Sequence, residues 1–125
     1  MSATGTAVVL DFIEAWNAND IERVVACLSD DVVYHNIPMQ PIVGRSDVHR
    51  YLTGKGGFDW VHWKLIAIAE NGPMVLTERI DEFGIGGRDV SLPLMGAFEV
   101  RGGRICAWRD YFDLAMYQRQ LAPRA

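Results

Sequence analysis

The chain contains little cysteine, no long hydrophobic run and no excess of positive charge. Its two cysteines, Cys27 and Cys106, lie far apart and form no Cys-x-x-Cys pair, so we expect both to be reduced and structural. The first apolar run, residues 7–10, is short and no basic residue precedes it. That pattern predicts neither a signal peptide nor a membrane span, and we expect a cytoplasmic protein without a membrane partner.

Positive charge is scarce relative to negative charge. The 125 residues contain 12 Lys and Arg against 16 Asp and Glu, which gives a formal net charge of −4. Proteins that bind the phosphate backbone of nucleic acids need the opposite balance. We therefore expect no nucleic-acid partner.

Several motifs of cofactor and catalytic sites are also missing. His35, His49 and His62 do not have the spacing of metal ligands, and the sequence has no Gly-x-Ser-x-Gly motif of a hydrolase nucleophile. Residues 54–57 place a lysine among glycines, but no Ser or Thr follows the lysine and no strand is predicted before it. This segment is more typical of a pocket rim than of a phosphate-binding loop. The sequence predicts neither a metal nor another cofactor.

What is present is apolar material with clear periodicity. Half of the residues are hydrophobic, enough for one core, and we expect a single domain over residues 1–125. Apolar residues at three- and four-residue steps predict a helix over residues 7–16, capped by Thr4 or Thr6. Asp20 can cap a second, short helix that turns Leu28 inward and ends at residues 29–31. Together these segments predict an N-terminal helical hairpin.

A strand and a third helix are predicted next. Residues 32–37 have strand character and are closed by Pro38 and Pro41. Gly44, with Ser46 as the cap, starts a helix that runs to about Leu52.

In the second half of the chain the hydrophobic period changes to two. Four strands are predicted at residues 60–70, 74–83, 89–100 and 104–113, joined by glycine-rich hairpin turns, and a short helix closes the chain at Leu114–Leu121. Pro93 removes a backbone donor inside its strand, so we expect either a bulge or an edge there. The fold class is α+β, with a curved mixed β-sheet packed on the helical hairpin and the third helix.

Polar residues interrupt faces that are otherwise apolar. Residues two apart share a face of a strand, so Tyr34 and Asn36 share the face of Val32. By the same rule, Arg79 and Asp81 share a face with three residues, Val75, Thr77 and Phe83. Asp110 likewise shares a face with Cys106, Trp108 and Phe112.

Charged groups on a buried face must meet one another, because an unpaired buried charge costs several kcal/mol, roughly. One reading leaves Arg79 and Asp81 as an exposed pair and Asp110 at a strand end. The other brings all three together, in which case one carboxyl holds a proton while the guanidinium offsets the charge of the other. That arrangement supplies one acid and one base at neutral pH.

These same residues carry a resemblance to a known family. The segments Tyr-His-Asn-Ile-Pro from Tyr34, Thr-Glu-Arg-Ile-Asp from Thr77 and Trp-Arg-Asp-Tyr-Phe-Asp-Leu from Trp108 resemble the limonene-1,2-epoxide hydrolases, within the nuclear-transport-factor-2-like superfamily of cone-shaped α+β domains. The resemblance covers about residues 8–114.

The resemblance implies a role for five residues. Asp110 would activate water as a general base, and Tyr34 and Asn36 would help to hold that water. Asp81 would donate a proton to the epoxide oxygen, and Arg79 would bridge the two carboxylates. The expected partners are a small hydrophobic epoxide and water, in a cofactor-independent reaction, and the family implies a homodimer.

Five further residues are expected to line the substrate pocket: Phe83, Leu92, Leu94, Trp108 and Phe112. Such a lining fits a neutral hydrophobic substrate. Two alternatives stay open within the same fold. A ketosteroid-isomerase-like enzyme would use an aspartate and a tyrosine without a bridging arginine, and a non-catalytic binding domain would keep the pocket without the polar pairs.

Overall fold

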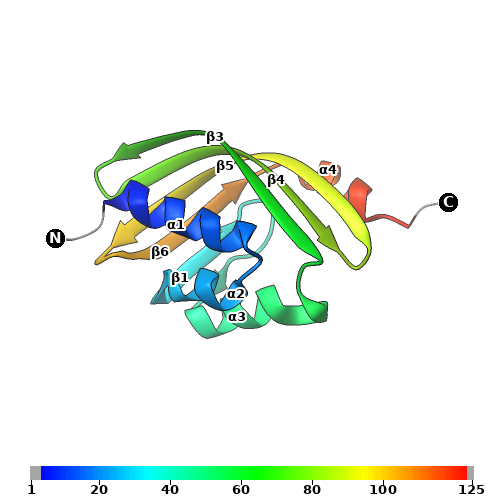
Figure 1. Ribbon diagram of the computed structural model, residues 1–125, viewed down its shortest axis with the longest axis horizontal. Coiled ribbons are helices and arrows are strands. Elements are labelled where there is room, and N and C mark those ends of the chain that lie inside the picture. The colour runs from blue at the N-terminus through cyan, green and yellow to red at the C-terminus, as the bar shows by residue number, and fades with distance from the viewer. Residues whose placement is uncertain (1–3, 124–125) are drawn as a thin grey trace.

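The computed structural model describes residues 4–123, apart from the side chain of Lys55. These residues form the helices and strands of Figure 1: α1 (Gly5–Asn17), α2 (Ile21–Ala26), β1 (Leu28–Asn36), β2 (Ile42–Val43), α3 (Arg45–Thr53), β3 (Trp60–Asn71), β4 (Met74–Ile85), β5 (Arg88–Arg101), β6 (Arg104–Tyr111) and α4 (Leu114–Leu121). A short 3₁₀ helix, Gly54–Gly56, follows α3.

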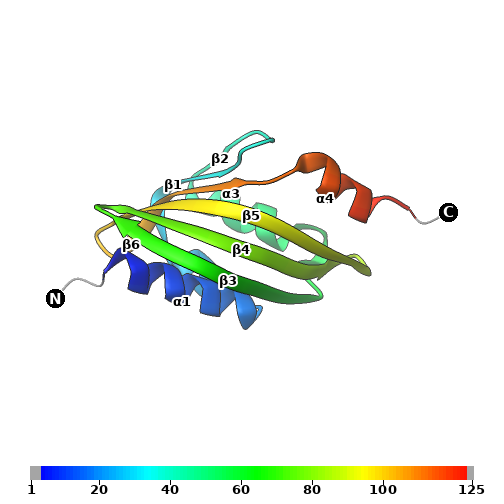
Figure 2. The ribbon, with the colours of Figure 1, turned by 90° about the horizontal axis from the view of Figure 1, so that it is seen from above.

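The strands form one six-stranded sheet in the order β2-β1-β6-β5-β4-β3. All neighbours are antiparallel except β1 and β6, which run parallel, so the sheet is mixed as the sequence predicts. The sheet is curved, and α1, α2 and α3 lie on one side of it (Figure 1). Seen from above, α4 follows the end of β6 and lies alongside β5, on the side of the molecule away from the N-terminus (Figure 2). The predicted fold class is confirmed.

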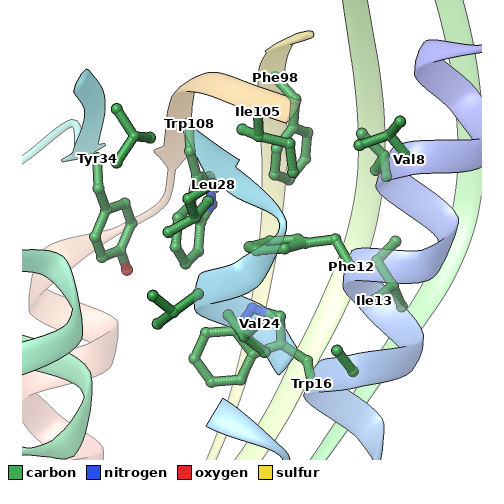
Figure 3. Packing of buried hydrophobic residues seen from close by; sticks show 14 of the residues in the cluster. Val8, Phe12, Ile13, Trp16, Val24, Leu28, Tyr34, Phe98, Ile105 and Trp108 are labelled. Carbon is green, nitrogen blue, oxygen red and sulfur yellow. The ribbon is translucent and has the colours of Figure 1, made fainter. Parts of the chain in front are cut away.

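The N-terminal helical hairpin forms where its caps and apolar spacing predict it. Thr4 Oγ1 accepts a hydrogen bond from Ala7 N (3.1 Å), and Asp20 Oδ1 accepts one from Arg23 N (3.1 Å). The apolar stripe of α1 faces the sheet, and the fully buried Phe12 ring contacts the Trp108 ring edge-on with centroids 4.9 Å apart (Figure 3). This contact joins α1 to the strand that carries Asp110.

The beginning of β1 differs from the prediction. Leu28 is the first residue of this strand rather than the last inward residue of α2, and residues 29–31 continue the strand instead of ending a helix. Leu28 is fully buried and pairs with Ile105 of β6. This pairing partner lies far away in the sequence, so local spacing could not indicate it.

The start of α3 also differs in detail. Gly44, with φ +93°, is the N-cap residue, and no side chain caps this helix, so the expected role of Ser46 is wrong. The two-residue strand β2 precedes it and was not predicted. In this strand Val43 pairs with Val33 of β1. Two residues are too few to show an alternating pattern in the sequence.

Pro93 lies at a local edge rather than at a bulge. Its register with Ile80 on β4 is continuous, whereas β6 pairs with β5 only from Met95 onward. Two residues before the proline, the backbone N and O of Ser91 bond to the Gln120 side chain of α4 (2.7 and 2.9 Å). Alternate residues of a strand point to the same side, so the missing donor of Pro93 faces the unpaired edge.

Two details of the last strands refine the predicted pattern. The turn between β5 and β6 is the two-residue hairpin at Gly102 and Gly103, both with positive φ, which suits the right-handed twist of the strands. A register shift between Glu99 and Val100 changes which side chains at the start of β6 point toward the core. As a result Ile105 joins the main core and Cys106 does not, contrary to the parity rule used above.

The face of the sheet away from α1 carries several exposed large apolar side chains: Val33, Val43, Leu76, Met95 and Tyr111. The homodimer expected from the sequence stays a prediction. Among residues 4–123, no helix is both long and apolar enough to cross a membrane.

Candidate active site

The five predicted site residues come from three strands and meet on the inner face of the sheet. Tyr34 and Asn36 lie on β1, Arg79 and Asp81 on β4, and Asp110 on β6. The register places Asn36 opposite Asp110, because β1 and β6 pair in parallel. On its other side, Asp110 lies opposite a glycine of β5, and β5 is the strand between β6 and β4.

Arg79 bridges the two carboxylates. Its Nε donates to Asp81 Oδ1 (3.0 Å), and its Nη2 donates to Asp81 Oδ2 (2.8 Å). The same Nη2 also lies 3.2 Å from both oxygens of Asp110. Nη1 donates to Thr77 Oγ1 (3.0 Å), so every nitrogen of the guanidinium has a partner. The predicted meeting of these groups is therefore observed, and the alternative of an exposed pair is wrong.

This charged group is almost completely buried. The side chain of Arg79 is 0% exposed, and those of Asp81 and Asp110 are each 5% exposed. The guanidinium also lies over the Trp63 ring, 4.2 Å from its centroid, which is a favourable cation-π position. Two carboxyls face one cation, so a single retained proton makes the buried cluster electrically neutral.

Burial shifts the acid–base properties of the cluster. It raises the pKa of Asp81 to about 6, although the neighbouring Arg79 acts to lower it. Burial also raises the pKa of Asp110, against the lowering effects of Arg79 and of the Trp108 hydrogen bond. Burial opposes the charged form of Arg79, but the two carboxylates hold its pKa above the usual range. The carboxyls titrate as a pair and the guanidinium stays charged.

Tyr34 and Asn36 form a neutral polar pair beside the carboxylates. Asn36 Nδ2 donates to the Tyr34 hydroxyl oxygen (2.9 Å), and this oxygen lies 3.2 Å from Asn36 Oδ1. Burial, followed by the charge of Asp110, raises the pKa of Tyr34 well above its ordinary value. Tyr34 therefore stays protonated and can both donate and accept hydrogen bonds.

A cavity opens onto this polar cluster. Tyr34, Asn36, Asp81 and Asp110 reach its surface, whereas Arg79 lies behind them. Four of the five predicted lining residues also reach it: Phe83, Leu92, Leu94 and Phe112.

Trp108 does not line the cavity, contrary to expectation. Its side chain is fully buried because α1 covers one side of the indole and Tyr34 stacks on it. Its Nε1 donates to Asp110 Oδ2 (3.1 Å), so it supports the carboxylate from behind the cavity wall.

The sequence reasoning missed several aromatic lining residues. The remaining lining residues are Trp16, Tyr51, Leu52, Phe58, Val61, Trp63 and Tyr117. Tyr51 comes from α3 and Tyr117 from α4, and how these helices dock on the sheet is not visible in local patterns. For Trp63 the sequence did contain a signal, because the alternation along β3 makes it an inward residue. In the structure it pairs with Asp81.

Among residues 4–123, no three His, Cys, Asp or Glu side chains gather as a group that could hold a metal ion. His49 instead contacts Glu22 (2.7 Å) at an exposed site. The cavity thus offers two carboxyls with raised pKa values, a fixed cation behind them and a neutral hydroxyl–amide pair. Chemically, this set can take a proton from one atom and give one to another.

Comparisons with known proteins bear on this site. The family model described as the limonene-1,2-epoxide hydrolase catalytic domain matches residues 3–122. The chain is 40% identical over 106 residues to epoxide hydrolase EphG of Mycobacterium tuberculosis, a match that covers 82% of this chain and 69% of that protein.

Solved structures agree with this relationship. An M. tuberculosis structure described as an LEH-like epoxide hydrolase superposes with a TM-score of 0.77 at 36% identity, covering 94% of this chain and 91% of that one. A putative polyketide cyclase of Xanthomonas campestris superposes with a TM-score of 0.79 at 23% identity, covering 94% and 96% of the two chains. At that lower identity, the likeness extends to the fold alone.

Proposed function

The chain belongs to the limonene-1,2-epoxide hydrolase family and is an epoxide hydrolase; from this premise, we propose that it adds water to a neutral hydrophobic epoxide in one step. The product is a vicinal diol. The single observation that carries the mechanism is the buried Arg79 Nη2, which contacts the carboxylates of both Asp81 (2.8 Å) and Asp110 (3.2 Å).

Asp110 is the proposed general base. It reaches the cavity surface directly opposite Asn36 in the sheet, and the Trp108 indole N–H favours its ionised form. A water between Asp110 and the Tyr34–Asn36 pair can donate one hydrogen bond to the carboxylate and use the hydroxyl and amide as further partners. Loss of its proton to Asp110 then makes this water nucleophilic toward an epoxide carbon.

Asp81 is the proposed general acid. Its raised pKa, about 6, keeps part of the carboxyl protonated near neutral pH, as a proton donor requires. Opening the epoxide breaks a carbon–oxygen bond and leaves a negative oxygen, which takes the proton of Asp81. After the step Asp110 holds the proton of the water and Asp81 is ionised, so the cluster has the same total charge as before.

Arg79 makes this exchange possible without a change of geometry. It contacts both carboxylates at once, so its positive charge stabilises whichever carboxyl is ionised at each stage. A planar guanidinium suits this task because it donates several hydrogen bonds in fixed directions.

The substrate is proposed to be neutral because the cavity walls are mainly aliphatic and aromatic. Phe83, Leu92, Leu94 and Phe112 surround the carboxyls, and a charged substrate would lose its hydration there without gaining a partner.

A substrate screen tests this function directly. Neutral epoxides should give vicinal diols, whereas an unsaturated ketosteroid should be returned unchanged. An isomerase moves a proton on carbon and does not need a cation between two carboxylates. Isomerisation of the steroid without diol formation from any epoxide would support the isomerase instead, and binding without turnover of either compound would support a non-catalytic domain.

A further inference from the structure

The strand between the two carboxylates contains a glycine next to the guanidinium that bridges them. Gly96 on β5 pairs with Thr77 on β4 and with Asp110 on β6. It lies under the guanidinium of Arg79, which extends from β4 toward β6. A side chain at this position would stand in the path of the arginine.

The backbone of Gly96 does not require glycine. Its φ is not among the positive values found at eight other glycines between residues 4 and 123, so an ordinary residue could adopt this conformation. Other residues are excluded because there is no room for a side chain. A Cβ on Gly96 would collide with Arg79 Nη1 and would lie 2.9 Å from both Asp110 Oδ1 and Thr77 Oγ1, closer than real Cβ atoms approach.

We propose that Gly96 is a positioning residue, whose missing side chain lets Arg79 cross β5 and reach Asp110. The β5 backbone cannot withdraw easily, because it pairs with β4 on one side and β6 on the other. The guanidinium must therefore move when a methyl group is added. Its 3.2 Å contacts to Asp110 are longer than its 2.8 Å contact to Asp81, so we expect the link to Asp110 to break first.

The consequence is chemical rather than a loss of substrate binding. Arg79 lowers the pKa of Asp110, so a displaced guanidinium lets this pKa rise further. The base is then ionised only at higher pH. Gly96 and Arg79 do not line the cavity, so the pocket walls remain in place.

The first test is the pH profile of Gly96→Ala, and this part rests on the proposed function. We expect kcat to fall at least about tenfold and the acidic limb of kcat to move up by about one pH unit, while KM stays within about threefold. Gly84→Ala is the matched control. Gly84 is another tight glycine, but its Cβ would meet Trp60 instead of Arg79, so its acidic limb should not move. An unchanged kcat and acidic limb in Gly96→Ala would overturn the proposal.

The second test is a stability cycle that needs no activity. Urea midpoints are measured at pH 5 for the parent, Gly96→Ala, Arg79→Ala and the double variant. Gly96→Ala should lower the midpoint of the parent by more than it lowers the midpoint of Arg79→Ala, because the guanidinium is absent there and only the Asp110 and Thr77 side chains still lie close to the methyl group. Gly84→Ala should lower the urea midpoint by the same amount in the parent and in Arg79→Ala.

The cycle also decides the matter if Gly96→Ala does not fold. In that case the folded Arg79→Ala variant is the reference: folding of the double variant supports a collision with the guanidinium, and failure of the double variant where Arg79→Ala alone folds overturns it. Equal costs of Gly96→Ala in both backgrounds would likewise show that the methyl group collides with something else. If this cycle succeeds while no epoxide is hydrolysed, the proposed function fails and the positioning of Arg79 stands.

Discussion

Tyr34 and Trp108 lie opposite each other on parallel strands, and their rings stack with centroids 3.7 Å apart and planes inclined by 16°. The indole that supports the Tyr34 ring also donates its N–H to Asp110 (3.1 Å). One buried side chain therefore sets the positions of both the hydroxyl and the carboxylate proposed to hold water. Preorganisation of this kind is what an efficient proton-transfer site requires.

Asp110→Asn should remove almost all epoxide-opening activity from a protein that still folds. The side-chain volume barely changes, but the water loses its base, and such groups contribute about 10²–10⁴-fold to the rate. The measurement is kcat/KM with circular dichroism as the check on folding. Asp31→Asn is the matched control, because Asp31 also pairs with an arginine but is exposed. Activity within about tenfold of the parent would remove Asp110 from the role.

Arg79→Lys should be nearly as damaging as Arg79→Ala. Lysine supplies a point charge, whereas the guanidinium of Arg79 donates from separate nitrogens to three side chains. Kinetic comparison of the two variants tests this, with Arg101→Lys at an exposed ion pair as the control. A fully active Arg79→Lys enzyme would mean that simple charge balance suffices.

The polar residues of the site could be predicted from the sequence more completely than the elements and side chains that surround them. Strand parity placed Arg79 and Asp81 on one face and Asp110 on an inward face, because side-chain alternation is a local property. Which strands become neighbours is not local. The parallel pairing of β1 with β6 joins segments from opposite ends of the chain, and it brings Asn36 beside Asp110.

The pocket walls show the same limit more clearly. Leu92 and Leu94 are inward strand residues and were expected to line the cavity, whereas Tyr51 and Tyr117 are half-buried or exposed residues of helices and were not. Helix docking depends on packing among many distant residues, so the amphipathic pattern of α3 and α4 predicts the helices but not what they cover. The prediction that Trp108 lines the cavity was wrong for a related reason. Its inward orientation was predicted correctly, but α1 and Tyr34 enclose it completely.

The rate should fall as the pH rises through about 6. Asp81 must be protonated to donate, and its pKa is raised to about 6, so the active fraction declines above that pH. The measurement is kcat/KM against pH for an alkyl epoxide. Asp81→Asn should lower the rate most for alkyl epoxides, whose leaving oxygen needs a proton, and should abolish this alkaline limb. If Asp81→Asn slows no substrate, Asp81 is merely structural.

Stability should also depend on pH through Asp81. The folded state holds its proton up to about pH 6, whereas an ordinary carboxyl releases it near 3.8, so the folded state binds more protons between these values. The contribution of Asp81 to the free energy of unfolding is therefore fully present below about pH 4 and is lost as the pH rises through about 6. Urea midpoints from pH 4 to 7 should fall less steeply for Asp81→Asn than for the parent. Parallel curves would contradict the raised pKa.

The number of chemical steps gives the last prediction. An epoxide hydrolase with a nucleophilic aspartate forms an ester with the substrate, and water then attacks that ester, so a carboxylate oxygen enters the diol. Here Tyr34, Asn36 and Asp110 can hold a water, and Asp81 can protonate the epoxide oxygen, so water should attack carbon directly with inversion. No protein oxygen should move. In a single turnover with excess enzyme in heavy-oxygen water, nearly all of the diol should carry the heavy isotope, and neither Asp110 nor Asp81 should carry it. Unlabelled first-turnover diol, or label recovered in a carboxylate, would reveal a covalent intermediate; the site would stand, but the carboxylate concerned would be a nucleophile rather than a base or an acid.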